Sequence, residues 1–157
     1  WSQVEESYAR THDMIVFMNE YYPNKGMAYY YKITTVYTDY ETEREIESNP
    51  VYTGGIVNPL EIPTITEAKA GNNHSVTIMW NKTEDCLGYA IYRSESVDGE
   101  YKWISNVENK SEIFWWQEYE SQATFTEKNL ELGKTYYYKI RPYVIYSEGT
   151  FYGDFYN

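Results

Sequence analysis

Hydrophobic and polar residues alternate along this chain over short stretches, a pattern typical of β-strands with one buried face. Glycine, asparagine and aspartate separate these stretches, as expected for turns. After residue 63 the pattern predicts seven strands, at 64–71, 74–82, 88–94, 101–107, 123–127, 134–146 and 150–156. Seven short strands in a segment of this length predict an all-β domain, an immunoglobulin-like sandwich of two packed sheets.

Three of these strands show most clearly which side chains face the core. In the stretch VTIMW, Val76, Ile78 and Trp80 share one face. In the next strand, Tyr89, Ile91 and Arg93 lie on one side, and Ala90 and Tyr92 on the other; in the strand 134–146, Tyr136, Tyr138 and Ile140 share a face. These apolar faces are the predicted core.

A domain boundary is expected within GGIVNPLEIPTI, residues 54–65, which combines two glycines with two prolines and little charge. Proline stiffens a connector towards an extended conformation. We therefore expect a first unit at 1–58, a linker at 59–63 and a second unit at 64–157.

One phrase occurs twice, as GMAYYYKI at residues 26–33 and as GKTYYYKI at 133–140. The second copy lies inside the complete series of strands. The first copy has only 28 residues before Tyr29, too few for the strands that precede the second copy.

The composition narrows the classes of function. The net charge is −11, with 20 tyrosines and 19% aromatic residues. A chain without a basic stripe is not expected to bind nucleic acid or anionic membranes, and no apolar run is long enough for membrane insertion. The single cysteine, Cys86, is expected to be a small buried residue.

The second unit resembles a bacterial fibronectin type III domain over 64–157. The likeness is carried by VTIMW, by GYAIYRSESVDGEY and by FTEKNLELGKTYYYKIRPY. The group Leu130, Gly133 and Tyr136 resembles the tyrosine corner of that family. The resemblance implies that Leu130 closes the end of the core, that Gly133 permits the turn, and that the Tyr136 hydroxyl bonds nearby backbone.

The first unit resembles only the last third of such a domain, with the equivalents of strands A to C missing. Uncovered apolar residues then form a candidate assembly surface, made by Tyr29, Tyr31, Ile33 and Val36. Three explanations remain open. The missing strands belong to a segment absent from this sequence, they come from another polypeptide by strand complementation, or the unit is rebuilt into a smaller fold.

An aromatic insert, EIFWWQEYESQ at 112–122, is the second candidate for a binding site. Its large side chains exceed what the core needs, so part of them is expected to be exposed. They suit a protein contact, sugar stacking, or simple coverage of a neighbouring surface. The residues concerned are Phe114, Trp115, Trp116 and Tyr119.

No catalytic motif is recognisable, and no cofactor is expected. The acidic stretches at 38–45 and 96–101 do not match a calcium loop and are interpreted as solvated turns, so no metal site is predicted.

These observations favour a non-enzymatic extracellular or cell-surface module with a structural, adhesive or assembly role. Its expected partner is a protein or neighbouring segment that completes the first unit. The alternatives are a carbohydrate-binding accessory module that takes a polysaccharide, and a fragment of a larger surface enzyme.

Overall fold

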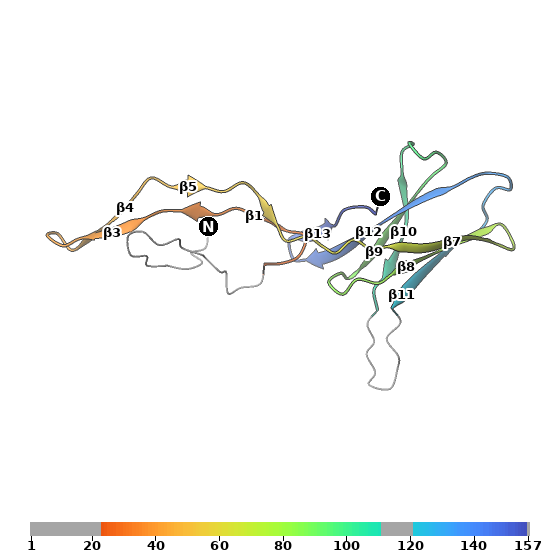
Figure 1. Cartoon of the computed structure of the whole chain (residues 1–157), viewed down its shortest axis with the longest axis horizontal. Coiled ribbons are helices and arrows are strands. Elements are labelled where there is room, and N and C mark those ends of the chain that lie inside the picture. Colours follow the sequence, from red (N-terminus) through yellow and green to blue (C-terminus); the bar gives the residue numbers. More distant parts are fainter. Residues whose placement is uncertain (1–22, 111–120, 157) are drawn as a thin grey trace, which may run out of the picture. The chain divides into compact units, whose positions relative to one another are not determined.

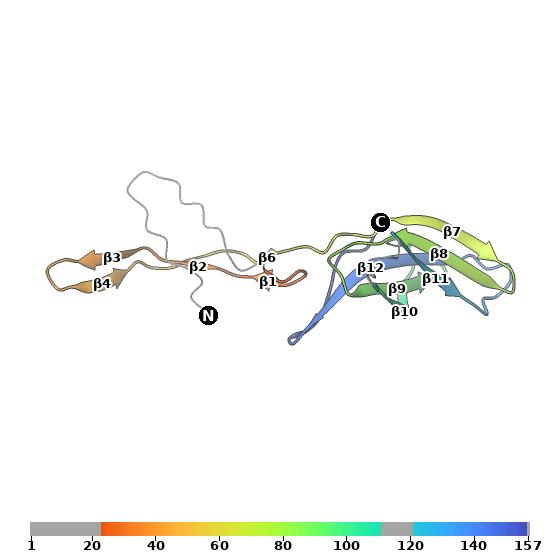
Figure 2. The same cartoon turned by 90° about the horizontal axis from the view of Figure 1, so that it is seen from below.

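The computed structural model describes residues 23–110 and 121–156. These residues form antiparallel sheets, and no helix occurs among them, so the all-β prediction is confirmed. In this described part no helix is long and apolar enough to cross a membrane. The chain divides into two compact units, Trp1–Asn58 and Pro59–Asn157, whose described strands are labelled in Figures 1 and 2 taken together.

The second unit is built from two antiparallel sheets (Figures 1 and 2). One has the strand order β11-β8-β7 and the other has the order β10-β9-β12-β13. The bounds are Ile65–Gly71 for β7, Ser75–Asn81 for β8, Gly88–Ser94 for β9, Lys102–Glu108 for β10, Gln122–Glu127 for β11, Tyr137–Tyr146 for β12 and Gly149–Tyr152 for β13.

All seven predicted strands are present, and their ends differ where the chain leaves the ladder. Residues 134–136 were expected in a strand but precede β12, because they form a corner described below. Residues 153–156 were also expected in a strand. They follow the end of β13 at Tyr152 and are not part of the strand. Tyr156 nevertheless donates its N–H to the carbonyl of Ile140 at 3.3 Å.

Side chains from both sheets meet in one core. Ile78 and Trp80 of β8 are fully buried against Tyr89 and Ile91 of β9 and Ile140 of β12. The Trp80 and Tyr89 rings lie edge to face, with centroids 5.4 Å apart. Burying a side chain of this size contributes about 1.5–3 kcal/mol, so this contact between the sheets is the main source of stability. The shared faces of Ile78 with Trp80 and of Tyr89 with Ile91 are thereby confirmed as core faces, and Ala90 on the opposite side of β9 is buried as well.

A polar network closes one end of this core. The hydroxyl of Tyr89 accepts the N–H of Thr83 at 2.7 Å, and burial raises the pKa of Tyr89 well above its ordinary value. The amide of Asn109 donates to the carbonyls of Thr83 and Cys86 at 2.7 and 3.2 Å. Cys86 is buried, as predicted. The network satisfies backbone groups that would otherwise be buried without partners.

Residues 59–63 do not form a free linker, in contrast to the prediction. Leu60 belongs to the core of the second unit, and Pro63 is fully buried. Proline and low charge suggested a connector, but Leu60 and Pro63 gain more by packing than by exposure, whereas Ile62 stays exposed.

The described part of the first unit is one long antiparallel hairpin, traced from red to yellow in Figures 1 and 2. Its ladders are β1-β6, β2-β5 and β3-β4. The bounds are Ala28–Tyr29 for β1, Lys32–Ile33 for β2, Val36–Asp39 for β3, Arg44–Glu47 for β4, Val51–Tyr52 for β5 and Ile56–Val57 for β6.

The packing of β9 against β10 and β12 can be tested by a substitution at Gly88. A Cβ at this position would lie 2.6 Å from the carbonyl oxygen of Val107 and 2.7 Å from the hydroxyl of Tyr143. We expect Gly88→Ala to lower the free energy of unfolding of the second unit by about 1–3 kcal/mol in urea titrations followed by tryptophan fluorescence. Gly54→Ala, at a position with open space around it, is the matched control and should change nothing. Equal stability of both variants would contradict this packing.

Candidate assembly surface

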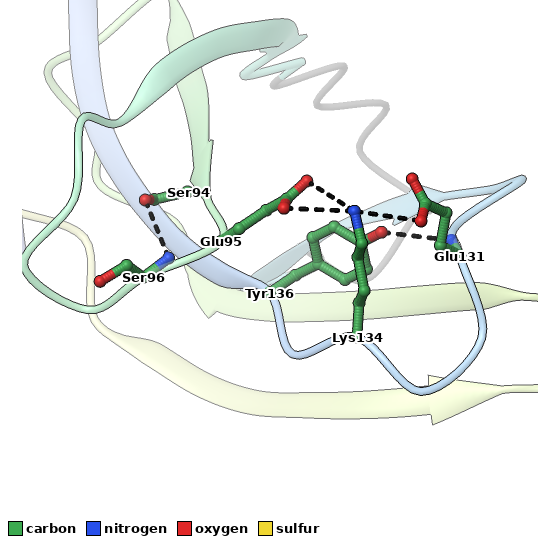
Figure 3. Close-up of polar contacts among 6 residues, drawn as sticks. All are labelled: Ser94, Glu95, Ser96, Glu131, Lys134 and Tyr136. Atoms are coloured by element: carbon green, nitrogen blue, oxygen red, sulfur yellow. Dashed lines mark hydrogen bonds and ion pairs between the residues drawn. The ribbon is translucent and has the colours of Figure 1, made fainter.

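The corner before β12 in the second unit has the geometry that the sequence predicts. Gly133 has a φ of +77°, a conformation that favours glycine. Three residues later, the hydroxyl of Tyr136 accepts the N–H of Glu131 at 3.2 Å (Figure 3). Leu130 is buried beneath this turn. The predicted roles of Gly133 and Tyr136 are therefore confirmed, whereas for Leu130 the structure shows burial alone.

Ion pairs flank the same corner. The ammonium of Lys134 lies 3.0 Å from a carboxylate oxygen of Glu131 and 3.3 Å from one of Glu95 (Figure 3). The hydrogen bonds that this ammonium donates, first to Glu131 and then to Glu95, raise the pKa of Lys134. All three side chains are exposed, so these pairs contribute little to stability. The hydroxyl of Tyr136 is the contact that fixes the turn.

The first unit repeats this corner. Gly26 has a φ of +76°, and the hydroxyl of Tyr29 accepts the N–H of Asn24 at 2.8 Å. In both units the bond spans five residues, and the glycine lies three residues before the tyrosine. The shared phrase YYYKI therefore begins a strand in the same local geometry twice.

The equivalence continues along both hairpins. Ser48 donates its N–H to the carbonyl of Thr35 at 2.9 Å, and Gly153 donates to the carbonyl of Pro142 at 2.9 Å. Next to these bonds, Val36 pairs with Glu47 in the first unit and Tyr143 pairs with Tyr152 in the second.

Both hairpins also contain an extra residue at the same place. In the first unit, Ile33 pairs with Val51 and Val36 pairs with Glu47. The two residues 34–35 therefore lie opposite the three residues 48–50. In the second unit, the carbonyl of Ile140 accepts the N–H of Tyr156, and Tyr143 pairs with Tyr152. The two residues 141–142 therefore lie opposite the three residues 153–155. The first hairpin thus has the backbone plan of β12 and the chain that returns along it, including a β-bulge.

What differs between the two units is burial. Ile140 is 0% exposed, whereas its equivalent Ile33 is 58% exposed. Val144 is 8% exposed, whereas its equivalent Tyr37 is 61% exposed. No residue in 23–58 is buried. The hairpin therefore keeps the local structure of a sandwich strand pair and presents its core positions to the surroundings.

The four residues predicted as an assembly surface all lie on this hairpin. Tyr29, Tyr31 and Ile33 occupy every second position, so strand alternation places them on one face. Val36 lies three residues beyond Ile33, and strand alternation therefore places it on the opposite face. Tyr29 and Tyr31 are partly buried, and Ile33 and Val36 are exposed. The aromatic insert residues Phe114, Trp115, Trp116 and Tyr119 lie outside the described residues.

The tip of the hairpin is acidic and locally ordered. Asp39 accepts hydrogen bonds from the Glu41 N–H at 3.0 Å and from the Thr42 hydroxyl at 2.7 Å. The bond from Thr42 is the main cause of the lowered pKa of Asp39. The ionised carboxylate stabilises the turn at neutral pH, and this stabilisation is lost as the pH falls through the lowered pKa.

A second surface, the outer aromatic face of the four-stranded sheet, was not predicted from the sequence. It is defined by two cations and the rings around them: Lys139, Arg141, Tyr92, Tyr101, Tyr152 and Phe155. The guanidinium carbon of Arg141 lies 4.1 Å from the ring centre of Tyr152 and 4.9 Å from that of Phe155. These cation–π contacts hold the C-terminal residues against β12.

The sequence does carry one signal for this face. In KIRP the two basic residues alternate with Ile140, so they must lie on the side of β12 away from the core. Their aromatic partners come from four distant positions, which alternation alone cannot bring together.

The described residues offer no group of three or more His, Cys, Asp or Glu side chains that could hold a metal ion. No model of a known protein family matches this chain, and no curated protein matches it.

The two corners give a matched pair of variants. Tyr136→Phe removes the acceptor of the Glu131 N–H and should lower the free energy of unfolding of the second unit by about 1 kcal/mol in urea titrations. Tyr29→Phe removes the equivalent bond of the hairpin and should leave that transition unchanged, while amide exchange at Asn24 accelerates. Unchanged stability in Tyr136→Phe would contradict a structural role for the corner.

The outer aromatic face is tested at Arg141. Arg141→Met keeps much of the side-chain volume but removes the cation, and it should cost about 1 kcal/mol of stability. Because the rings around Arg141 include Phe155, amide exchange at Tyr156 should also become faster. Lys128→Met, at an exposed position outside this face, is the control. Slow exchange at Tyr156 in both variants would show that the cation does not hold this segment.

Proposed function

We propose that the chain is a non-catalytic structural and interaction module of an extracellular or cell-surface protein, with one fibronectin type III-like domain and an incomplete unit that serves as an assembly element. The single observation that carries this proposal is the hairpin at residues 23–58, which has the backbone plan of a sandwich strand pair without any buried side chain. An isolated two-stranded hairpin is marginally stable in water, so covering this one by another segment or chain would stabilise it.

The pairing of strands supports the fibronectin type III part of the proposal. In immunoglobulin-like sandwiches the first, second and fifth strands share one sheet, and the third, sixth and seventh share the other. Here β7, β8 and β11 form one sheet, and β9, β12 and β13 belong to the other. The fourth strand, β10, lies at the edge of the second sheet beside β9.

The apolar surface of the hairpin supports an assembly role. Its exposed large side chains include both aliphatic and aromatic residues and lie on both faces of the hairpin, and a partner that covers either face would remove apolar surface from water. They are Tyr30, Ile33, Val36, Tyr37, Ile46, Val51, Tyr52, Ile56 and Val57.

The proposal is tested by light scattering after size-exclusion chromatography, combined with amide hydrogen exchange on the whole chain. We expect association that increases with protein concentration, or fast exchange in 28–57 beside slow exchange in β8, β9 and β12. Ile33→Asp should abolish the association. Tyr40→Asp, at a position that is 93% exposed at the hairpin tip, is the matched control and should not. A monomer at every concentration with slow exchange throughout the hairpin would overturn the proposal.

Carbohydrate binding by an accessory module of a larger secreted enzyme is the alternative. It rests on Phe114, Trp115, Trp116 and Tyr119, which lie outside the described residues, so it stays a prediction. Titration with polysaccharides should then change the tryptophan fluorescence, and Trp115→Ala or Trp116→Ala should remove the response. A panel of glycans without any response would exclude this alternative.

A further inference from the structure

We propose that one edge of the hairpin, the acceptor edge formed by Lys32–Val36, takes up an extended strand of a separate polypeptide, antiparallel and in the register that β9 adopts on β12. This inference rests on the proposed assembly role and adds the edge, the direction and the side-chain pattern of the partner.

The register comes from the second unit. There β12 is bounded by two neighbours, with β13 on one side and β9 on the other. The β9 pairs are Ile140 with Ile91 and Pro142 with Tyr89. Because Ile33 and Thr35 are the equivalents of Ile140 and Pro142, the arriving strand should place an isoleucine-like residue opposite Ile33 and an aromatic residue opposite Thr35.

The backbone groups of the acceptor edge point the right way. In antiparallel sheets successive residues direct their N–H and C=O groups to opposite sides. Thr35 already bonds to Ser48 on the return strand of the hairpin. Lys32, Thr34 and Val36 therefore direct theirs to the other side. In the second unit the carbonyl of Tyr143, the equivalent of Val36, accepts the N–H of Leu87 at 2.9 Å on the β9 side.

No third strand pairs with the β2-β5 or β3-β4 ladder among the residues that the structure describes. The strand of this chain with the required pattern, β9, is buried in its own core, where Tyr89 and Ile91 are 0% exposed. Using it elsewhere would uncover Trp80 and Ile140. We therefore assign the arriving strand to a separate polypeptide, and the exchange experiment below tests whether a segment of the chain outside the described residues fills the edge instead. Backbone bonds along the edge give affinity, and the alternate side chains set the register.

The test uses a synthetic peptide with the sequence of residues 87–95 as a stand-in for the partner strand, added to the whole chain. Thr35→Cys in the chain is combined with peptides that carry Tyr89→Cys, Ile91→Cys or Arg93→Cys. Non-hydrogen-bonded pairs bring side chains closest, so a disulfide should form several-fold faster with the first peptide than with the other two. The parent chain, in which Cys86 is buried, gives the background.

Amide exchange and two chain variants complete the experiment. The unmodified peptide should slow exchange at Lys32, Thr34 and Val36. Ile33→Lys should abolish both this protection and the preferred disulfide, whereas Tyr40→Lys should retain them. Equal disulfide rates with the three peptides would overturn the register. Slow exchange at Lys32, Thr34 and Val36 in a peptide-free monomer would show that the chain fills the edge itself, which overturns supply in trans. Association of the chain without register preference would leave the proposed assembly role standing and remove only this inference.

Discussion

A strand with one apolar face gains its stability only when another sheet covers that face. In the second unit, Ile78 and Trp80 of one sheet cover Ile91 and Ile140 of the other, and all four are essentially removed from solvent. The burial of these and the other core side chains opposes the conformational entropy lost when the two sheets are ordered. The strands, the polar network around Tyr89 and the outer aromatic face all depend on that contact, because it holds the two sheets in place.

The comparison of the two units separates local from tertiary structure. The corner at Gly26 and Tyr29 and the bulge at 48–50 form in a hairpin that has no buried residue. A bond across five residues and a hairpin register are short-range features, so they do not require a core. Exposure of Ile33 beside complete burial of Ile140 shows what the second sheet adds.

The sequence predicted the features that depend on neighbouring residues. Alternation located the seven strands of the second unit and the shared faces of Ile78 with Trp80 and of Tyr89 with Ile91, and the repeated YYYKI indicated that 26–33 and 133–140 are equivalent segments. The equivalence of the two bulges could not be predicted from the sequence, because Ser48-Asn49-Pro50 and Gly153-Asp154-Phe155 have no residue in common. Their likeness lies in backbone hydrogen bonds. The composition of 59–63 likewise led to the wrong assignment of Leu60 to a linker. Whether a leucine beside a proline is buried depends on residues far along the chain.

The bulge at residues 48–50 also makes the two edges of the hairpin unequal. Pro50 has no N–H to donate, and the extra residue interrupts the even spacing of backbone groups on the β4–β5 side. A strand that arrives at this side cannot form a continuous ladder, whereas β2 and β3 offer a regular one. Sheet growth on this hairpin is therefore favoured on one side, at the edge of β2 and β3. The bulge thereby guards the other side of the hairpin against edge-to-edge pairing with further chains.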